Sequence, residues 1–237
     1  MTNSTVKPNR FEYIDQFRGL IVILMLLDHS SYYLNSVQKY LDPADPLFSS
    51  WGQFMLRYSS YLCASGFLMM NGAMVWYSFQ NRRRKDIPAG EIRWYFIKRG
   101  LFLVLLQLTW VNSSWSGFAR IDLFHLGIIS TIGMSMIFLS FVIHLKWIYR
   151  LIIAVAILMI HPFLLQIPYD PQNAWQMALM QTFVDAGEFN KYPVIPWFAV
   201  AILGSVMANG WLRAWDTDKK KVYMGLLIAA GAFLIAI

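Results

Sequence analysis

Seven long apolar runs, separated by short polar segments, dominate this chain of 237 residues. A helix needs about 20 apolar residues to cross the hydrocarbon core of a bilayer, and each run is close to that length. Lipid offers no partner to backbone polar groups, so a spanning segment must satisfy them within a helix or a closed barrel. We therefore predict an all-α, polytopic transmembrane helix bundle of about seven spans, forming a single domain over residues 1–237. The runs cover approximately residues 16–34, 53–79, 95–112, 122–144, 150–167, 194–211 and 222–237.

The composition agrees with this prediction and excludes several other classes of protein. The chain is 57% hydrophobic and only 14% charged, which excludes a disordered segment. Its single cysteine, Cys63, can form no intrachain disulfide, and no set of residues has the spacing of a metal site. The net charge of +7 comes from basic residues in short loops between apolar runs. We interpret these residues as a topology signal and expect no nucleic-acid partner.

The distribution of lysine and arginine predicts the orientation of the spans. With a cytoplasmic N-terminus, the inner segments hold sixteen basic residues and the outer segments hold three, while Arg57 lies inside a span. Short cytoplasmic loops of membrane proteins are enriched in such residues. We therefore expect the N-terminus to be cytoplasmic, which places His29, His125 and His161 toward the outer side of the membrane.

The first span carries the two residues that most strongly indicate chemistry. Arg18 and His29 enclose ten residues, of which eight are Leu, Ile, Val or Met. Eleven helical steps make about three turns plus roughly 20° and rise about 16 Å, so both side chains lie on nearly the same face. Ionisable groups at membrane depth are costly and mark functional sites. We expect Arg18 to bind a phosphate at the membrane edge and His29 to act as a base or acyl carrier.

Both residues also have structural interpretations. Arg18 follows Asp15 by three positions, which favours a local ion pair at the inner interface. His29 could instead extend to the outer interface or bond to a backbone carbonyl. Asp28 directly precedes His29 and is about 100° away around the helix. We therefore expect the Asp28 carboxylate to bond to a neighbouring helix instead of stacking beneath the imidazole.

Two later spans carry further histidines. Asp122 and His125 are three residues apart, so a helix would place them on one face as an acid–base pair. His161 directly precedes Pro162, and we expect it to cap backbone groups that the proline leaves free.

Several cations are candidate binding residues. A cation at membrane depth needs an anionic partner, so Arg57 in the second span and Arg120 near the fourth are candidates for binding a substrate. Tyr61, four positions after Arg57, is a third candidate for binding the substrate. Lys98 and Arg99, at the inner end of the third span, are expected to add to the phosphate-binding cations.

Blocks of residues along nearly the whole chain resemble one family. In order, they are Arg10 to Leu20 with Met25, Asp28 and His29, then Phe54 to Arg57 with Cys63 and Gly72, then Ile97 to Leu101, Ile132 to Met136, and Tyr192 to Trp197 with Gly204. In these blocks the chain is similar to bacterial relatives of the heparan-α-glucosaminide N-acetyltransferase catalytic domain, a branch of the transmembrane acyltransferases.

The resemblance implies acyl transfer across the bacterial inner membrane. An acetyl or similar group would pass from cytoplasmic acetyl-CoA to a sugar or glycan acceptor on the outer side. By this resemblance, Arg18 would contact the phosphates of CoA, and His29 would serve as base or acyl carrier. Val22 and Met25 lie between them on the same stripe, along which the pantetheine arm could lie.

A non-catalytic accessory subunit of a larger membrane complex is the alternative interpretation. By the resemblance, relatives have several more helices than seven, so we expect this chain to be short at its C-terminus relative to them. Tyr61 stands where bacterial relatives commonly carry a histidine. On this interpretation the chain would bind lipid and partner subunits but no acyl-CoA.

Overall fold

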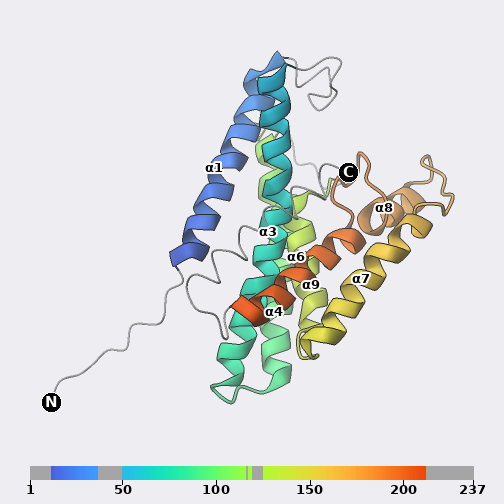
Figure 1. Cartoon of the computed structure of the whole chain (residues 1–237). Coiled ribbons are helices and arrows are strands. Elements are labelled where there is room, and N and C mark those ends of the chain that lie inside the picture. The colour runs from blue at the N-terminus through green and yellow to red at the C-terminus, as the bar shows by residue number, and fades with distance from the viewer. Residues whose placement is uncertain (1–11, 37–49, 116, 119–124, 212–237) are drawn as a thin grey trace. The chain divides into compact units, whose positions relative to one another are not determined.

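The computed structural model describes residues 12–36, 50–115, 117–118 and 125–211. Apart from one isolated bridge between Leu126 and Asn190, the regular structure in these ranges is helical, so the all-α prediction is confirmed. The predicted run at 222–237 lies outside the described residues. The helices are α1 (Glu12–Leu34), α3 (Trp51–Arg83), α4 (Ala89–Leu106), the π-helix η1 (Gln107–Val111), α5 (Asn112–Trp115), α6 (Ile128–Val142), α7 (Trp147–Leu164), α8 (Ala174–Phe183) and α9 (Val194–Trp211) (Figure 1).

The largest differences from the predicted boundaries are at the starts of two helices. The helix predicted over 95–112 begins earlier, at Ala89, and continues through η1 and α5 to Trp115. The helix predicted over 122–144 begins only at Ile128, because the backbone of Gly127 is extended and the Leu126 N–H donates to the Phe189 carbonyl, 2.8 Å away. The short helix α8 lies within a segment that has no long apolar run.

The described residues form two compact units, and the first contains α1 and the part of α3 up to Phe67. In this unit α1 packs against the first part of α3. Ile21 is buried, and its carbonyl oxygen lies 3.8 Å from the buried Cys63 Sγ, which donates to it. A Cβ at Gly66 would come within 2.6 Å of Ile21 Cδ1, so the absence of a side chain there lets the two helices approach closely.

The second unit, Leu68–Ala230, is a bundle in which α4 packs on α6, α6 on α9, and α9 on α7. Helix α9 is apolar all round, which is typical of a buried helix. The core draws residues from five helices: Val75, Trp76, Phe79, Ile92, Phe96, Met136, Leu139, Ile143, Ala154, Ala199, Ile202 and Ala208.

Glycines allow close contact at two helix crossings of this unit. Gly100 of α4 and Gly133 of α6 face each other, because a Cβ on either would meet the backbone oxygen of the other. A Cβ at Gly72 of α3 would overlap the carbonyl oxygen of Ala201 on α9. Gly72 therefore allows close packing of α3 on α9.

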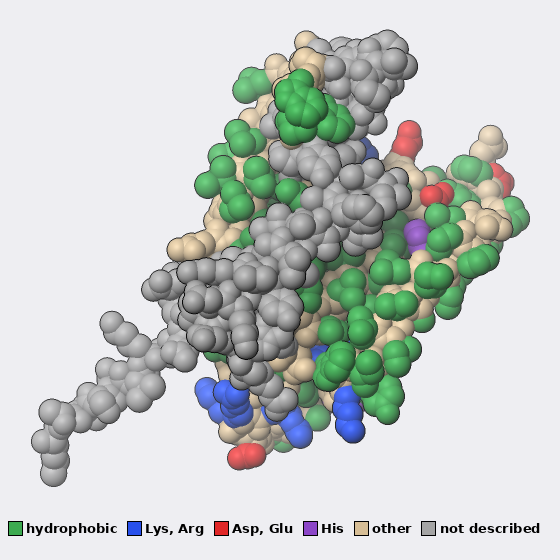
Figure 2. Space-filling view, viewed as in Figure 1, with side chains coloured by type: hydrophobic (Ala, Val, Ile, Leu, Met, Phe, Trp, Pro, Cys, Tyr) green, Lys and Arg blue, Asp and Glu red, His purple; other side chains and the backbone are tan. Residues whose placement is uncertain are grey.

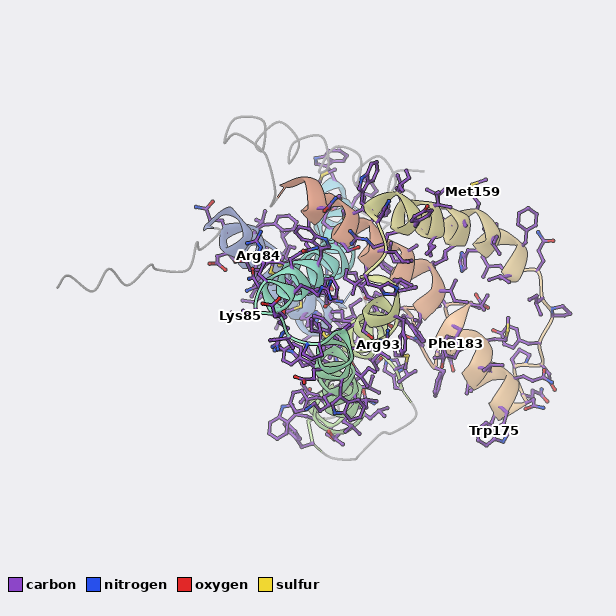
Figure 3. The ribbon with its side chains drawn as sticks, turned by 90° about the horizontal axis from the view of Figure 1, so that it is seen from below. Arg84, Lys85, Arg93, Met159, Trp175 and Phe183 are labelled. Carbon is purple, nitrogen blue, oxygen red and sulfur yellow. The ribbon has the colours of Figure 1, made fainter. Side chains whose placement is uncertain are left out.

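One side of α7 exposes a continuous apolar surface. Helix α7 (Trp147–Leu164) has a mean hydropathy of 1.9 and is the one described helix long and apolar enough to cross a membrane; Ile128–Val142 and Val194–Asn209 are shorter apolar helices. The outward residues of α7 include Ile152, Met159 and Phe163, and hydrophobic side chains cover this part of the surface in Figure 2. Met159 on α7 and Trp175 on α8 both project outward in Figure 3. Exposed apolar surface of this extent marks a contact with lipid or another protein.

One end of the second unit is rich in basic side chains. The α3–α4 turn carries Arg83, Arg84 and Lys85, and the α6–α7 connection carries Lys146, all exposed. Lys and Arg side chains gather at this end in Figure 2, while Figure 3 shows Arg84 and Lys85 together. Both connections therefore place positive charge at the same end of the bundle.

Candidate functional site

The stripe between Arg18 and His29 lies on one unbroken helix. Helix α1 runs from Glu12 to Leu34, so the rise of about 16 Å and the shared face expected for the two residues both hold. The Arg18 and His29 side chains are 48% and 47% exposed, and Val22 between them is also exposed. The described neighbours therefore leave these three side chains exposed, while Met25 on the same stripe is partly buried.

Both ends of the stripe carry a carboxylate. Arg18 Nη1 lies 3.8 Å from Asp15 Oδ1, which confirms the local pair expected from their spacing. Asp28 Oδ2 lies 3.6 Å from His29 Nδ1. The angle of about 100° between adjacent residues therefore does not keep these side chains apart. At this distance the two groups form no hydrogen bond, and the expected bond of Asp28 to a neighbouring helix stays a prediction.

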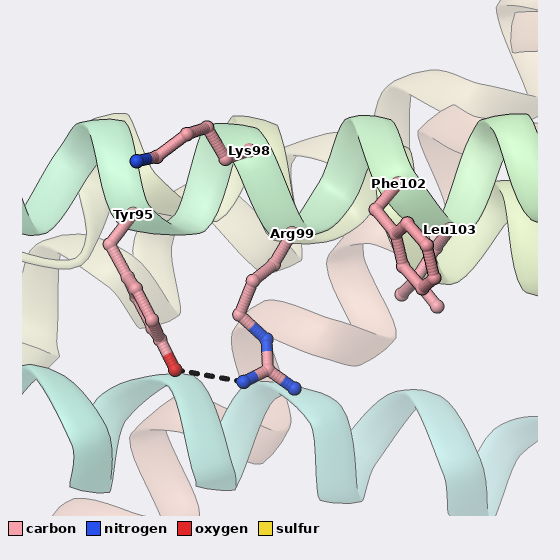
Figure 4. A pocket seen from close by; sticks show the side chains of 5 residues that line it. All are labelled: Tyr95, Lys98, Arg99, Phe102 and Leu103. Carbon is pink, nitrogen blue, oxygen red and sulfur yellow. Dashed lines mark hydrogen bonds between the residues drawn. The ribbon is translucent and has the colours of Figure 1, made fainter.

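A cavity of about 400 Å³ opens on one face of α4. Its described lining consists of Tyr95, Lys98, Arg99, Phe102 and Leu103, which recur at helical spacing over two turns (Figure 4). Lys98 and Arg99, which the sequence predicts to bind phosphate, therefore lie in one cavity. Phe102 and Leu103 make the adjoining turn of its wall apolar.

Tyr95 holds two guanidinium groups beside this cavity. Arg99 Nη1 donates a hydrogen bond of 2.8 Å to the Tyr95 hydroxyl, drawn as the dashed line in Figure 4. Arg82, at the end of α3, places its Cζ 3.6 Å from the centre of the Tyr95 ring. A cation over an aromatic face is attracted by the ring quadrupole. One tyrosine thus fixes arginines from two helices.

The region around His125 differs from its prediction. Residues 125–127 are not helical, so the helical spacing expected for Asp122 and His125 does not extend to His125; Asp122 itself lies outside the described residues. His125 Nδ1 lies 3.0 Å from the Glu188 carbonyl oxygen instead. Because a carbonyl only accepts, Nδ1 carries a proton, and in the neutral form of the ring the lone pair is therefore on Nε2.

Buried amides support the backbone at His125. Gln107, in the π-helical turn η1, donates a hydrogen bond of 2.7 Å to Asn112 Oδ1. Asn112 Nδ2 in turn donates a hydrogen bond of 2.7 Å to the carbonyl oxygen of His125. A Cβ at Gly127 would lie 3.0 Å from the Gln107 amide, so glycine makes room for this network. Single π-turns of this kind occur often at functional sites.

Asn190 anchors the opposite side of this region, and its removal is expected to destabilise the protein. The side chain is 0% exposed. Its amide nitrogen donates a hydrogen bond of 3.0 Å to the Tyr192 carbonyl oxygen, and its amide oxygen accepts one of 3.0 Å from the Tyr192 N–H. Asn190→Ala leaves these buried groups without that partner, so we expect a loss of about 1–3 kcal/mol in unfolding free energy. Thermal unfolding followed by tryptophan fluorescence measures it. Lys191→Ala, at the exposed neighbouring position, is the control; equal midpoints for both variants would contradict the assignment.

His161 caps a freed backbone group, although on another helix than expected. Pro162 lies inside α7, and His161 Nε2 is 2.8 Å from the carbonyl oxygen of Val184. Val184 is the C-cap of α8, so its carbonyl lies at the helix end, where the last carbonyls have no partner within the helix. His161 therefore joins α7 to the end of α8.

The remaining candidates lie outside the described residues. Arg120 and Asp122 belong to the undescribed segment 119–124, and the side chains of Arg57 and Tyr61 are not described, although their backbone belongs to α3. Their binding and catalytic roles stay predictions.

The cavity includes a residue that the sequence interpretation missed. Tyr95 stands four residues before Arg99, and this spacing on a helix is sufficient to predict their contact. Arg82 has no such signal, because its contact with Tyr95 depends on how the α3–α4 turn returns the chain.

The family of the chain follows from comparison with known proteins. The model of the family described as heparan-alpha-glucosaminide N-acetyltransferase, catalytic, matches residues 10–234. The chain therefore belongs to this family of membrane-associated acetyltransferases, as the sequence blocks indicate. Neither a curated protein nor a solved structure gives a significant match.

Proposed function

We propose that this protein is an integral membrane acyltransferase of the bacterial inner membrane. It would pass an acetyl or similar group from cytoplasmic acetyl-CoA to an extracytoplasmic sugar acceptor, and the family description makes a glucosaminide amine the first acceptor to test. The observation that carries the proposal is the unbroken α1 helix, with an exposed cation and an exposed imidazole about 16 Å apart on one face.

The chemistry assigns different tasks to the two ends of α1. Arg18 binds the donor phosphates, for which a guanidinium fork is suited. The acceptor amine attacks the acetyl carbonyl, the thioester C–S bond breaks, a C–N bond forms, and the thiol of CoA leaves. His29 takes the proton of the amine as base, or carries the acetyl group between donor and acceptor. Asp28, 3.6 Å away, stabilises the imidazolium.

Other residues are assigned with this function. Lys98 and Arg99 bind donor phosphates, and His125, with its Nε2 lone pair, is a second acid–base group together with Asp122. Arg57, Tyr61 and Arg120 bind the acceptor.

The proposed topology has about seven spans and a cytoplasmic N-terminus. The basic end of the second unit supports it, because the α3–α4 and α6–α7 connections are both expected to be cytoplasmic. The exposed apolar surface of α7 would face lipid.

Arg18→Gln is expected to separate donor binding from chemistry. Removing one charge-assisted contact to phosphate should raise KM for acetyl-CoA about tenfold or more while kcat stays near wild type. The assay uses the full chain in nanodiscs, [14C]acetyl-CoA and glucosamine-terminated oligosaccharides. Lys85→Gln, at the exposed turn, is the control. Absence of both transfer and CoA binding in the wild type, with stoichiometric copurification of partner subunits, would instead establish the accessory-subunit alternative.

A further inference from the structure

We infer that the cavity on α4 is a binding site for a phosphate ester that carries an apolar chain, and that Tyr95 is the residue that organises it. Two molecules place apolar carbon beside a phosphate ester, namely the CoA donor of the proposed function, through the gem-dimethyl and methylene groups of its pantetheine arm, and an anionic phospholipid, through its acyl chains. The inference rests on the proposed function only for the first of them.

The charge of the cavity calls for an anion. Lys98 and Arg99 line it, and Arg82 is held against Tyr95 at its edge. Among the described residues, no carboxylate forms a salt bridge with any of these three cations. Like charges held close together repel, and a bound anion relieves that repulsion.

The orientation of Arg99 favours phosphate over a simple counterion. Its Nη1 is engaged by the Tyr95 hydroxyl at 2.8 Å, so the side chain is fixed before any ligand arrives. The rest of its planar fork remains available, and such a fork binds two oxygens of one phosphate. Lys98, one residue before it, supplies a mobile ammonium as a second contact.

The apolar wall indicates that the bound phosphate belongs to a ligand that also carries apolar groups. Phe102 and Leu103 continue the cavity along α4 from Lys98 and Arg99 (Figure 4). Phe102 is exposed and Leu103 is half-buried, so a ligand chain would cover apolar surface there. A free inorganic phosphate would leave this wall unused.

Tyr95 is a positioning residue in this site, because it acts through the arginines. Tyr95→Phe keeps the ring on which Arg82 lies but removes the oxygen that fixes Arg99. Arg99→Gln removes the phosphate contact itself. Arg93→Gln is the matched control, since Arg93 is also on α4 but lies over the Phe141 ring, 5.1 Å from its centre, and does not line the cavity.

The experiment measures binding with the full chain. One arm titrates detergent-purified protein with CoA by calorimetry; the other compares thermal midpoints in phosphatidylglycerol and phosphatidylcholine nanodiscs. In at least one arm, we expect Arg99→Gln to weaken binding about tenfold or more, and Tyr95→Phe to weaken it less, with Arg93→Gln unchanged. The responding arm identifies the source of the phosphate.

Two results would overturn the inference. The first is that neither Arg99→Gln nor Tyr95→Phe, as folded protein, changes the result of either arm. The second is that Arg93→Gln weakens binding as much as Arg99→Gln does, which would indicate general charge attraction. Failure here is distinct from failure of the proposed function, which is measured as acetyl transfer and depends on His29.

Discussion

Replacing His29 by alanine is expected to reduce acetyl transfer by about 10²- to 10⁴-fold, the usual contribution of a general acid–base group. The side chain is 47% exposed on α1, so its removal leaves no large cavity, and the thermal midpoint should stay close to wild type. Donor binding should also persist, because the phosphates are assigned to cations and not to the imidazole. The loss should therefore appear in kcat.

The control for this experiment is His144→Ala. His144 is exposed in the connection between α6 and α7, at the basic end of the second unit. The His144→Ala variant should transfer acetyl groups at the wild-type rate. Equal turnover by wild type and His29→Ala would remove His29 from the reaction and with it the role proposed for α1.

Gly204→Val is expected to have the largest effect on stability. A Cβ at Gly204 of α9 would overlap the backbone carbonyl of Met69 on α3, so the two helices must separate. Backbone atoms cannot rotate away, and α9 contributes Ala199, Ile202 and Ala208 to the core. We expect a loss of about 3 kcal/mol or more in unfolding free energy.

Tryptophan fluorescence can follow this loss, because Trp76 is buried in the same core. A destabilisation of that size corresponds to a midpoint roughly 6–12 °C lower for a chain of this length. Gly90→Val is the matched control, since nothing lies within 4 Å of a Cβ at Gly90. An unchanged midpoint for Gly204→Val would show that α3 and α9 are not in backbone contact.

Most of the described helices were predictable because they depend on a local property, the length of an apolar run. The α1 helix over Glu12–Leu34 and the α9 helix over Val194–Trp211 follow from such runs. Helix α8 does not, because it is short and is capped by the preceding Asn173, whose side chain accepts hydrogen bonds from the backbone N–H groups of Trp175 and Gln176. Its position depends on a cap inside a polar segment.

The candidate site was predictable only where one helix contains it. Arg18 and His29 share α1, and Lys98 and Arg99 share α4, so helical periodicity places each pair correctly. The surroundings of His125 depend on Glu188, 63 residues away, through a contact between irregular segments. No periodicity in the sequence encodes a contact of that kind.

Acetyl transfer across a sealed membrane tests the central claim most directly. The full chain is reconstituted in liposomes that enclose a glucosamine-terminated oligosaccharide, and [14C]acetyl-CoA is added outside. We predict that label accumulates on the enclosed oligosaccharide with the wild type and not with His29→Ala. Label that appears only on oligosaccharide supplied on the same side as acetyl-CoA, or on none, would contradict the account.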